Sequence, residues 1–172
     1  MSLREKLKQL LLKHVHFYRE SGVSCSGSVK LRDAHTGEIL EENHNIEVDD
    51  GLKLICYMLT DESGYDTGLT YQAIGTDSTT PTVSDTTLGT ETNRKTFTER
   101  KTNFTTDIRM EFSTFFTASE ADDVIGEVGI FGHDATGALD SGTLFCRALL
   151  SFDNSAATND ITITWAVIVS RT

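Results

Sequence analysis

The residues that could do chemistry in this chain include five histidines and three cysteines, so zinc binding and nucleophilic catalysis are the first possibilities. His14 and His16 are two residues apart in a predicted helix, so they point in different directions and cannot share a metal ion. Cys25, Cys56 and Cys146 are odd in number and widely spaced, which fits neither a disulfide framework nor a zinc site. We therefore predict no metal and no cofactor, and we expect Cys56 and Cys146 to act as small core residues.

The carboxylates form short acidic pairs, and none has the spacing of a catalytic or calcium-binding motif. A calcium loop alternates oxygen ligands around a glycine, and these pairs lack that spacing. Asp122 and Asp123 could form a loose, shared calcium site; the alternative is that they cap a helix and lie in a solvated loop. Two strands could place Glu111 and Glu127 together, as sugar hydrolysis requires. The sequence contains no Gly-x-Ser-x-Gly and no glycine-rich phosphate loop. We predict that the protein is not an enzyme.

Charge is unevenly distributed along the 172 residues. The net charge is −11, yet residues 1–20 contain five basic and two acidic side chains. An acidic body repels phosphates, so we expect no nucleic-acid partner. The longest apolar runs fall short of the roughly 18 residues of a membrane span, and we expect no membrane partner. The basic residues 1–20 could therefore pair with the acidic remainder of a neighbouring copy or with another acidic protein.

The first 20 residues predict an amphipathic docking helix. Ser2 and Glu5 have the spacing of a capping box, and one helical face is apolar. The residues of that face are Leu3, Leu7, Leu10 and Leu11. This helix could pack on its own domain, on a neighbouring subunit, on a membrane surface or on a different protein, so we place an interface here.

Residues 21–172 predict a second unit, which opens with a hairpin and a helix. Segments 28–31 and 38–42 flank a turn that ends at Gly37. A helix near 50–62 follows, for which Asp49 or Asp50 is the expected cap. Its predicted apolar face consists of Leu52, Ile55, Cys56 and Leu59.

From residue 69 the hydrophobic period changes from that of a helix to two, which indicates strands. We expect strands near 94–98, 103–116, 124–131, 143–152 and 161–169. Several such strands separated by turn residues predict a mainly β fold, an antiparallel, jelly-roll-like β-sandwich. The 25 threonines favour strands that have one face exposed to solvent. The expected core residues are Phe112, Ile130, Phe131, Ile163, Trp165 and Val167.

A polar loop near 76–92 interrupts this pattern. It is longer than the connections that compact domains normally use, and long loops are often functional. We expect packing to order it, for which contacts across subunits are one possible source, because nothing in its own sequence explains its order. The interface residues predicted here are Thr76, Pro81, Val83, Leu88 and Arg94.

Several motifs occur in a characteristic order. They are Asn45, Asp50-Gly51-Leu52, Ala73-Ile-Gly-Thr76, Thr80-Pro-Thr-Val-Ser-Asp-Thr-Thr-Leu88, and Glu91 to Arg94. The second half contributes Glu127-Val-Gly-Ile-Phe131, Gly142-Thr-Leu-Phe-Cys-Arg147 and Thr158-Asn-Asp-Ile-Thr-Ile-Thr-Trp165. Over residues 43–169 this order resembles small structural proteins of tailed bacteriophages.

The resemblance implies a non-enzymatic virion component, made and assembled in the host cytoplasm. Its partners would be copies of itself and other virion proteins. Tail, baseplate, collar, fibre-attachment and capsid-decoration positions all stay open. The alternative is a receptor- or carbohydrate-binding sandwich, which needs exposed aromatic side chains. The candidates are Tyr57, Tyr65 and Tyr71, of which Tyr71 is expected in the core.

Overall fold

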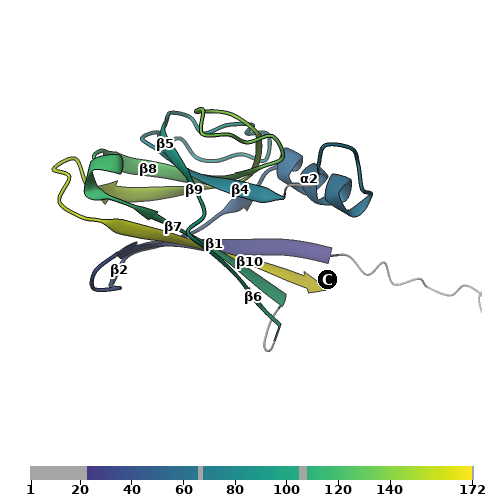
Figure 1. Ribbon diagram of the computed structural model, residues 1–172, viewed down its shortest axis with the longest axis horizontal. Coiled ribbons are helices and arrows are strands. Elements are labelled where there is room, and N and C mark those ends of the chain that lie inside the picture. The colour runs from purple at the N-terminus through teal and green to yellow at the C-terminus, as the bar shows by residue number, and fades with distance from the viewer. Residues whose placement is uncertain (1–22, 66–67, 105–107, 172) are drawn as a thin grey trace, which may run out of the picture.

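A computed structural model describes residues 23–65, 68–104 and 108–171. In this part of the chain, two five-stranded antiparallel sheets pack face to face, with one α-helix at one end (Figure 1). The prediction of a mainly β, antiparallel sandwich is confirmed. The predicted docking helix at 1–20, with Leu3, Leu7, Leu10 and Leu11, lies outside the described residues.

The first sheet contains the first and last strands of the described chain. Its order is β2 (Ile39–His44), β1 (Val23–Asp33), β10 (Ile161–Arg171), β7 (Ile108–Phe116) and β6 (Glu99–Asn103). The second sheet has the order β3 (Ile46–Glu47), β9 (Thr143–Asp153), β8 (Val124–Gly132), β4 (Leu69–Gly75) and β5 (Glu91–Thr96). Helix α2 (Asp49–Leu59) follows β3, and a short 3₁₀ helix, η1 (Ala118–Glu120), precedes β8.

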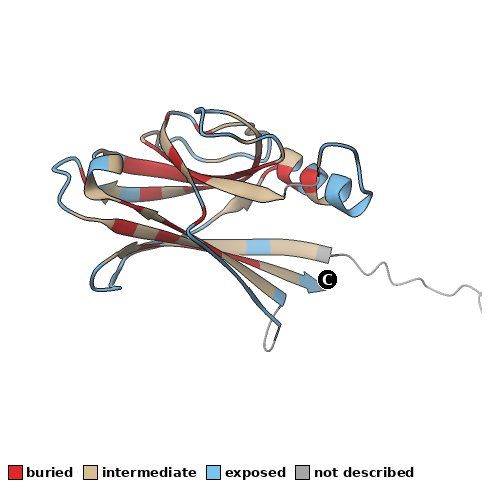
Figure 2. Ribbon diagram, viewed as in Figure 1, coloured by how far each residue is buried: buried red, intermediate tan, exposed pale blue. Residues whose placement is uncertain are grey.

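The main core fills the space between the sheets. Figure 2 shows that strands of both sheets contain buried segments. Trp165 of β10 is fully buried and lies between Phe112 of β7 and Val29 of β1 in the strand register. The residues expected in the core are all buried: Phe112, Ile130, Phe131, Ile163, Trp165 and Val167. Phe131, however, belongs to a second cluster with Val48, Ala73, Leu88 and Leu144. Alternate strand residues point to opposite faces, so Phe131 lies on the outer side of the second sheet, whereas Ile130 faces the main core.

The strands at 91–116 differ from the prediction in their bounds. A single strand was expected over 103–116, but β6 ends at Asn103 and β7 begins at Ile108. These two strands pair in antiparallel register, with Glu99 opposite Ser113. The period-two pattern is the same on both sides of such a turn, so the sequence pattern alone did not reveal the reversal.

The predicted apolar face of α2 is wrong for three of its four residues, and only Ile55 packs against the main core. Gly51 and Leu54 are the buried residues, whereas Leu59 is 82% exposed and Cys56 is also exposed. The reason is close backbone contact, since a Cβ atom on Gly51 would lie only 2.1 Å from the carbonyl oxygen of Phe145. A glycine allows this approach, and the helix therefore rests on its Gly51 side.

The predicted cap of α2 is also wrong. Val48 is the N-cap residue, and no side chain caps the helix. The backbone N–H of Asp49 instead donates to the carbonyl oxygen of Val83 at 2.7 Å. A carbonyl from the long loop therefore satisfies an N–H group that a side chain usually satisfies.

Candidate interaction surfaces

The long loop, residues 76–90, connects β4 to β5 and is braced from within its own subunit. The backbone N–H of Thr76 donates to the carbonyl oxygen of Thr90 at 3.0 Å, which closes the base of the loop. Leu88 is buried in the second cluster, against the outer side of the second sheet. The expectation that packing orders this loop is therefore confirmed, and the packing lies within its own subunit.

Arg147 of β9 is the centre of the bracing. Its side chain is 4% exposed and donates to the carboxylates of three residues. The partners are Asp77 at 2.9 Å, Asp85 at 2.7 Å and Glu127 at 2.7 Å. A guanidinium has five donors in a planar fork, so it can hold several carboxylates at once where an ammonium would act as a point charge. Two of these partners belong to the loop, which Arg147 thus attaches to the sheet.

Glu127 of β8 completes this attachment. Its side chain is fully buried and accepts the backbone N–H groups of Gly89 and Thr90 at 3.0 and 2.7 Å. A buried carboxylate requires such partners, because its desolvation is otherwise very costly. Arg147 and Glu127 together hold both ends of the loop, and we call them with Asp77 and Asp85 the loop brace.

Local hydrogen bonds and the contacts between brace residues shift the pKa values of Asp77, Asp85 and Arg147. A hydrogen bond from Thr79, followed by the contact with Arg147, lowers the pKa of Asp77 below its ordinary value. Burial alone would raise the pKa of Asp85, but hydrogen bonds from Thr82 and Arg147 outweigh it and hold that pKa low. The guanidinium of Arg147 is desolvated, yet its bonds to Asp85 and Glu127 raise its pKa. Asp77, Asp85 and Arg147 are therefore charged at neutral pH.

The loop residues predicted as interface divide into two groups. Val83 is 55% exposed, and Thr76 and Pro81 are half-buried, so all three have surface to offer a neighbour. Leu88 is only 3% exposed. The prediction that Leu88 lies in an interface is wrong, because its side chain is buried in the second cluster beneath the loop.

Arg94 is likewise internal, contrary to its predicted interface role. Its side chain is fully buried and donates to Glu91 at 2.6 Å and to the carbonyl oxygen of Ser141 at 2.7 Å. Its guanidinium also lies 4.5 Å from the ring centre of Phe131, a cation–π contact. Arg94 thus connects β5 to the turn between β8 and β9. Its buried guanidinium is not accessible to a partner.

Sequence reasoning missed the bracing role of Arg147 and Glu127. Both are charged residues inside otherwise apolar strands, next to Cys146 and Val128 respectively. A charge at such a position needs a buried partner, and this was the available signal. It did not identify the partners, because Asp77 is 70 residues from Arg147 in the sequence.

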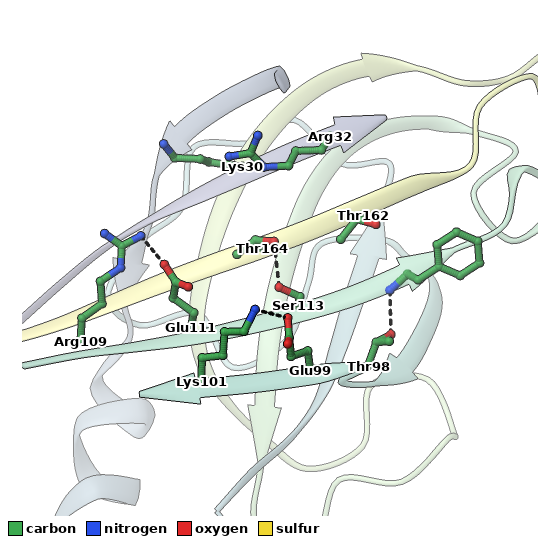
Figure 3. Close-up of a pocket in the computed structure, with 11 residues that line it drawn as sticks. Lys30, Arg32, Thr98, Glu99, Lys101, Arg109, Glu111, Ser113, Thr162 and Thr164 are labelled. Carbon is green, nitrogen blue, oxygen red and sulfur yellow. Dashed lines mark hydrogen bonds and ion pairs between the residues drawn. The ribbon is translucent and has the colours of Figure 1, made fainter. Parts of the chain in front are cut away.

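The outer face of the first sheet is open and carries a polar hollow of about 430 Å³ (Figure 3). Four strands contribute alternate residues to it, which places their side chains on one face. The lining residues are Lys30, Arg32, Thr98, Glu99, Lys101, Arg109, Glu111, Ser113, Phe115, Thr162 and Thr164.

Charges in the hollow are paired across short distances. Arg109 contacts Glu111 at 2.6 Å, and Lys101 contacts Glu99 at 2.7 Å. Arg32 donates to the carbonyl oxygen of Gly37. These groups retain solvent exposure, with Arg109 and Glu111 at 33% and 34%. The hollow has the hydroxyl, cationic and carboxylate groups that hydrogen-bond a polyhydroxylated ligand.

The two carboxylates considered for sugar hydrolysis do not meet. Glu111 lines the hollow on the outer face of the first sheet, whereas Glu127 lies under the loop on the outer side of the second sheet. The core between the sheets separates the two faces. A Glu111–Glu127 pair is therefore excluded as an acid–base site.

Aromatic side chains gather beside α2. The rings of Tyr57 and Tyr65 lie 4.5 Å apart, and Tyr65 stacks on His133 at 4.0 Å. His133 also bonds the carbonyl oxygen of Gly64 at 2.8 Å. His133 is therefore part of a packed cluster beside α2. Tyr71 is half-buried against the second cluster.

The cysteines do not come together. Cys146 is buried, and desolvation raises the pKa of its thiol well above the ordinary value. Cys56 is exposed, so the expectation that it lies in the core is wrong. Within the described ranges, no three His, Cys, Asp or Glu side chains converge to hold a metal ion. In the same residues, no helix has the length and apolar character needed to cross a membrane.

Comparison of the chain with protein-family models, curated proteins and solved structures gave no significant match.

Proposed function

We propose that this chain is a non-enzymatic structural subunit of a tailed-bacteriophage virion, which associates with copies of itself and with other virion proteins. One observation carries the proposal: the loop brace holds the long loop in place through contacts within its own chain. Surfaces that are ordered in advance lose little entropy on association. The side chain of Val83 in this loop is 55% exposed and can contact a partner.

The arrangement of the strands also suits a subunit that assembles. The sheets end in edge strands β2, β6, β3 and β5. All five residues of β6 are exposed, and three of them, Glu99, Arg100 and Lys101, are charged. Charged edges discourage indiscriminate strand pairing, so association through the loop is favoured over association through β6. Within this proposal the sandwich is jelly-roll-like, an architecture that viral capsid proteins use, and the protein functions in the virion after assembly in the host cytoplasm.

The test is the molar mass of the purified full chain, measured by light scattering after gel filtration. We expect a single closed multiple of 18.9 kDa, since identical subunits assemble with closed symmetry. Val83→Asp should shift the protein toward the monomer, and Ile39→Asp, at an exposed site on β2, is the matched control. A monomer that also fails to associate with neighbouring virion proteins would contradict the proposal.

A second candidate function is supported by the polar hollow on the first sheet. Its hydroxyl and charged side chains suit a carbohydrate or a receptor glycan. A glycan array tests this candidate, with Arg109→Ala and Thr164→Val as variants that should abolish any signal. Glycan binding that depends on these two residues would favour the receptor-binding alternative over the purely structural role.

A further inference from the structure

Helix α2 has two apolar faces, and its own domain uses only one. Gly51 and Leu54 are buried against the sandwich, and Ile55 packs against the main core. A second, exposed stripe follows one side of the helix, because residues at i, i+4 and i+7 share one side. This exposed stripe consists of Leu52, Cys56 and Leu59, of which Leu52 and Leu59 are 46% and 82% exposed.

Exposed apolar side chains are concentrated on α2. Of the eleven exposed large hydrophobic residues in the part of the chain that the structure describes, four lie on α2. Leu52 and Leu59 belong to the stripe, whereas Tyr57 and Met58 lie outside it. Scattered exposed apolar residues need no explanation, but a contiguous group marks an interaction site. The stripe therefore indicates a contact with an apolar partner.

The same chain contains a segment that matches the stripe. Leu3, Leu7, Leu10 and Leu11 give residues 2–18 an apolar face with helical spacing. At 1.5 Å per residue, that face is about 12 Å long and the α2 stripe about 10 Å. We propose that the exposed stripe of α2 is the docking surface for the amphipathic segment 2–18 of its own chain.

Charge complementarity supports this occupant. Residues 49–62, which form α2 and the turn after it, contain four acidic side chains and one lysine. Residues 1–20 contain five basic and two acidic side chains. Opposite charges around an apolar contact favour the correct pairing and orientation.

The chain path supports the same occupant. Strand β1 begins at Val23, and its first residues lie at the same end of the long axis of the sandwich as α2 (Figure 1). Only residues 19–22 separate the proposed docking segment from β1. A short tether raises the effective concentration of a segment at a nearby site to the millimolar range or so. Its own segment therefore has an advantage over a free partner.

A disulfide trap tests the proposal in the full chain, with Cys56 as the reporter already present on the stripe. In a Cys25→Ser background, Leu7→Cys should form an intrachain disulfide with Cys56 under mild oxidation. Lys8→Cys is the matched control, because its side chain belongs to the polar side of the same segment. Peptide mapping identifies the bond, and the buried thiol of Cys146 stays unreacted. Equal trapping from positions 7 and 8 overturns the proposal, and a disulfide-linked dimer overturns it in favour of a second copy.

Limited proteolysis provides a readout without new cysteines. Leu59→Glu should speed tryptic cleavage after Lys8 and Lys13 about tenfold, because undocking exposes the segment to protease. Ile39→Glu introduces the same charge at an exposed apolar site on β2 and should leave the cleavage rate unchanged. Equal rates in the parent chain and both variants overturn the proposal. The result does not depend on the virion role, which the molar mass tests separately.

Discussion

The outer faces of the two sheets contain similar ion pairs in opposite environments. On the second sheet, Arg147 and Glu127 are 4% and 0% exposed beneath the loop. On the first sheet, Arg109 and Glu111 are 33% and 34% exposed in the open hollow. Both pairs are short, at 2.7 and 2.6 Å. The distance is therefore no guide to their importance, because burial decides what the loss of one partner costs.

The largest effect is expected at the buried centre. Arg147→Met removes the guanidinium and leaves Glu127 buried without its countercharge. We expect a loss of about 3–5 kcal/mol in the free energy of unfolding, measured by urea denaturation. The double variant Arg147→Met with Glu127→Gln should recover part of this loss, since the unpaired charge is gone. A loss below about 1 kcal/mol in the single variant would mean that this buried pair contributes no more to stability than an exposed ion pair does.

The next effect concerns the apolar anchor of the loop. Leu88→Ala should cost about 2–4 kcal/mol, because it leaves a cavity in the cluster under the loop. Val83→Ala is the control in the same loop, where the side chain is 55% exposed, and it should stay within about 0.5 kcal/mol. Thermal unfolding of both variants measures the difference. Similar losses at the two positions would mean that the loop does not cover the second sheet.

Acid should weaken the covered face more than the open one. The pKa values of Asp77 and Asp85 are lowered in the folded state. Their contribution is therefore present above the unfolded pKa, near 4, and is lost as pH falls through the lower folded values. We expect the melting temperature to fall from about pH 5 downward. Asp85→Asn should lower it at pH 7 and flatten the acid dependence, whereas an unchanged slope would contradict this assignment.

The smallest effect is expected in the hollow. Arg109→Met should change the free energy of unfolding by less than about 1 kcal/mol, since both partners retain contact with water. Urea denaturation under the conditions used for Arg147→Met gives the direct comparison. If the two arginine variants were equally destabilised, the contrast between the covered and open faces would be wrong.

Much of the fold could be predicted from local patterns. The alternation of Ile161, Ile163, Trp165 and Val167 predicts a strand with one buried side, and all four residues are fully buried. The turn that ends at Gly37 was predicted from its composition, and the N–H groups of His35 and Thr36 donate to Asp33 there. Such features depend on neighbours in the sequence, which the sequence displays.

The interaction surfaces were less predictable. Leu88 and Arg94 were expected to face a partner, yet both are buried in their own subunit. A leucine or arginine in a polar loop has the same local pattern in either case. What separates the cases is the sheet beneath the loop, which consists of residues far away in the chain.

The sequence by itself determined the strand periodicity, the position of α2 and the presence of charges in apolar strands. Tertiary structure alone decided which face of α2 is buried, since that depends on the contact of Gly51 with Phe145. It also decided that Arg147 meets Asp85, 62 residues away in the sequence. Secondary structure follows from short-range periodicity, whereas burial and ion pairing depend on which distant surfaces the packed sheets bring together.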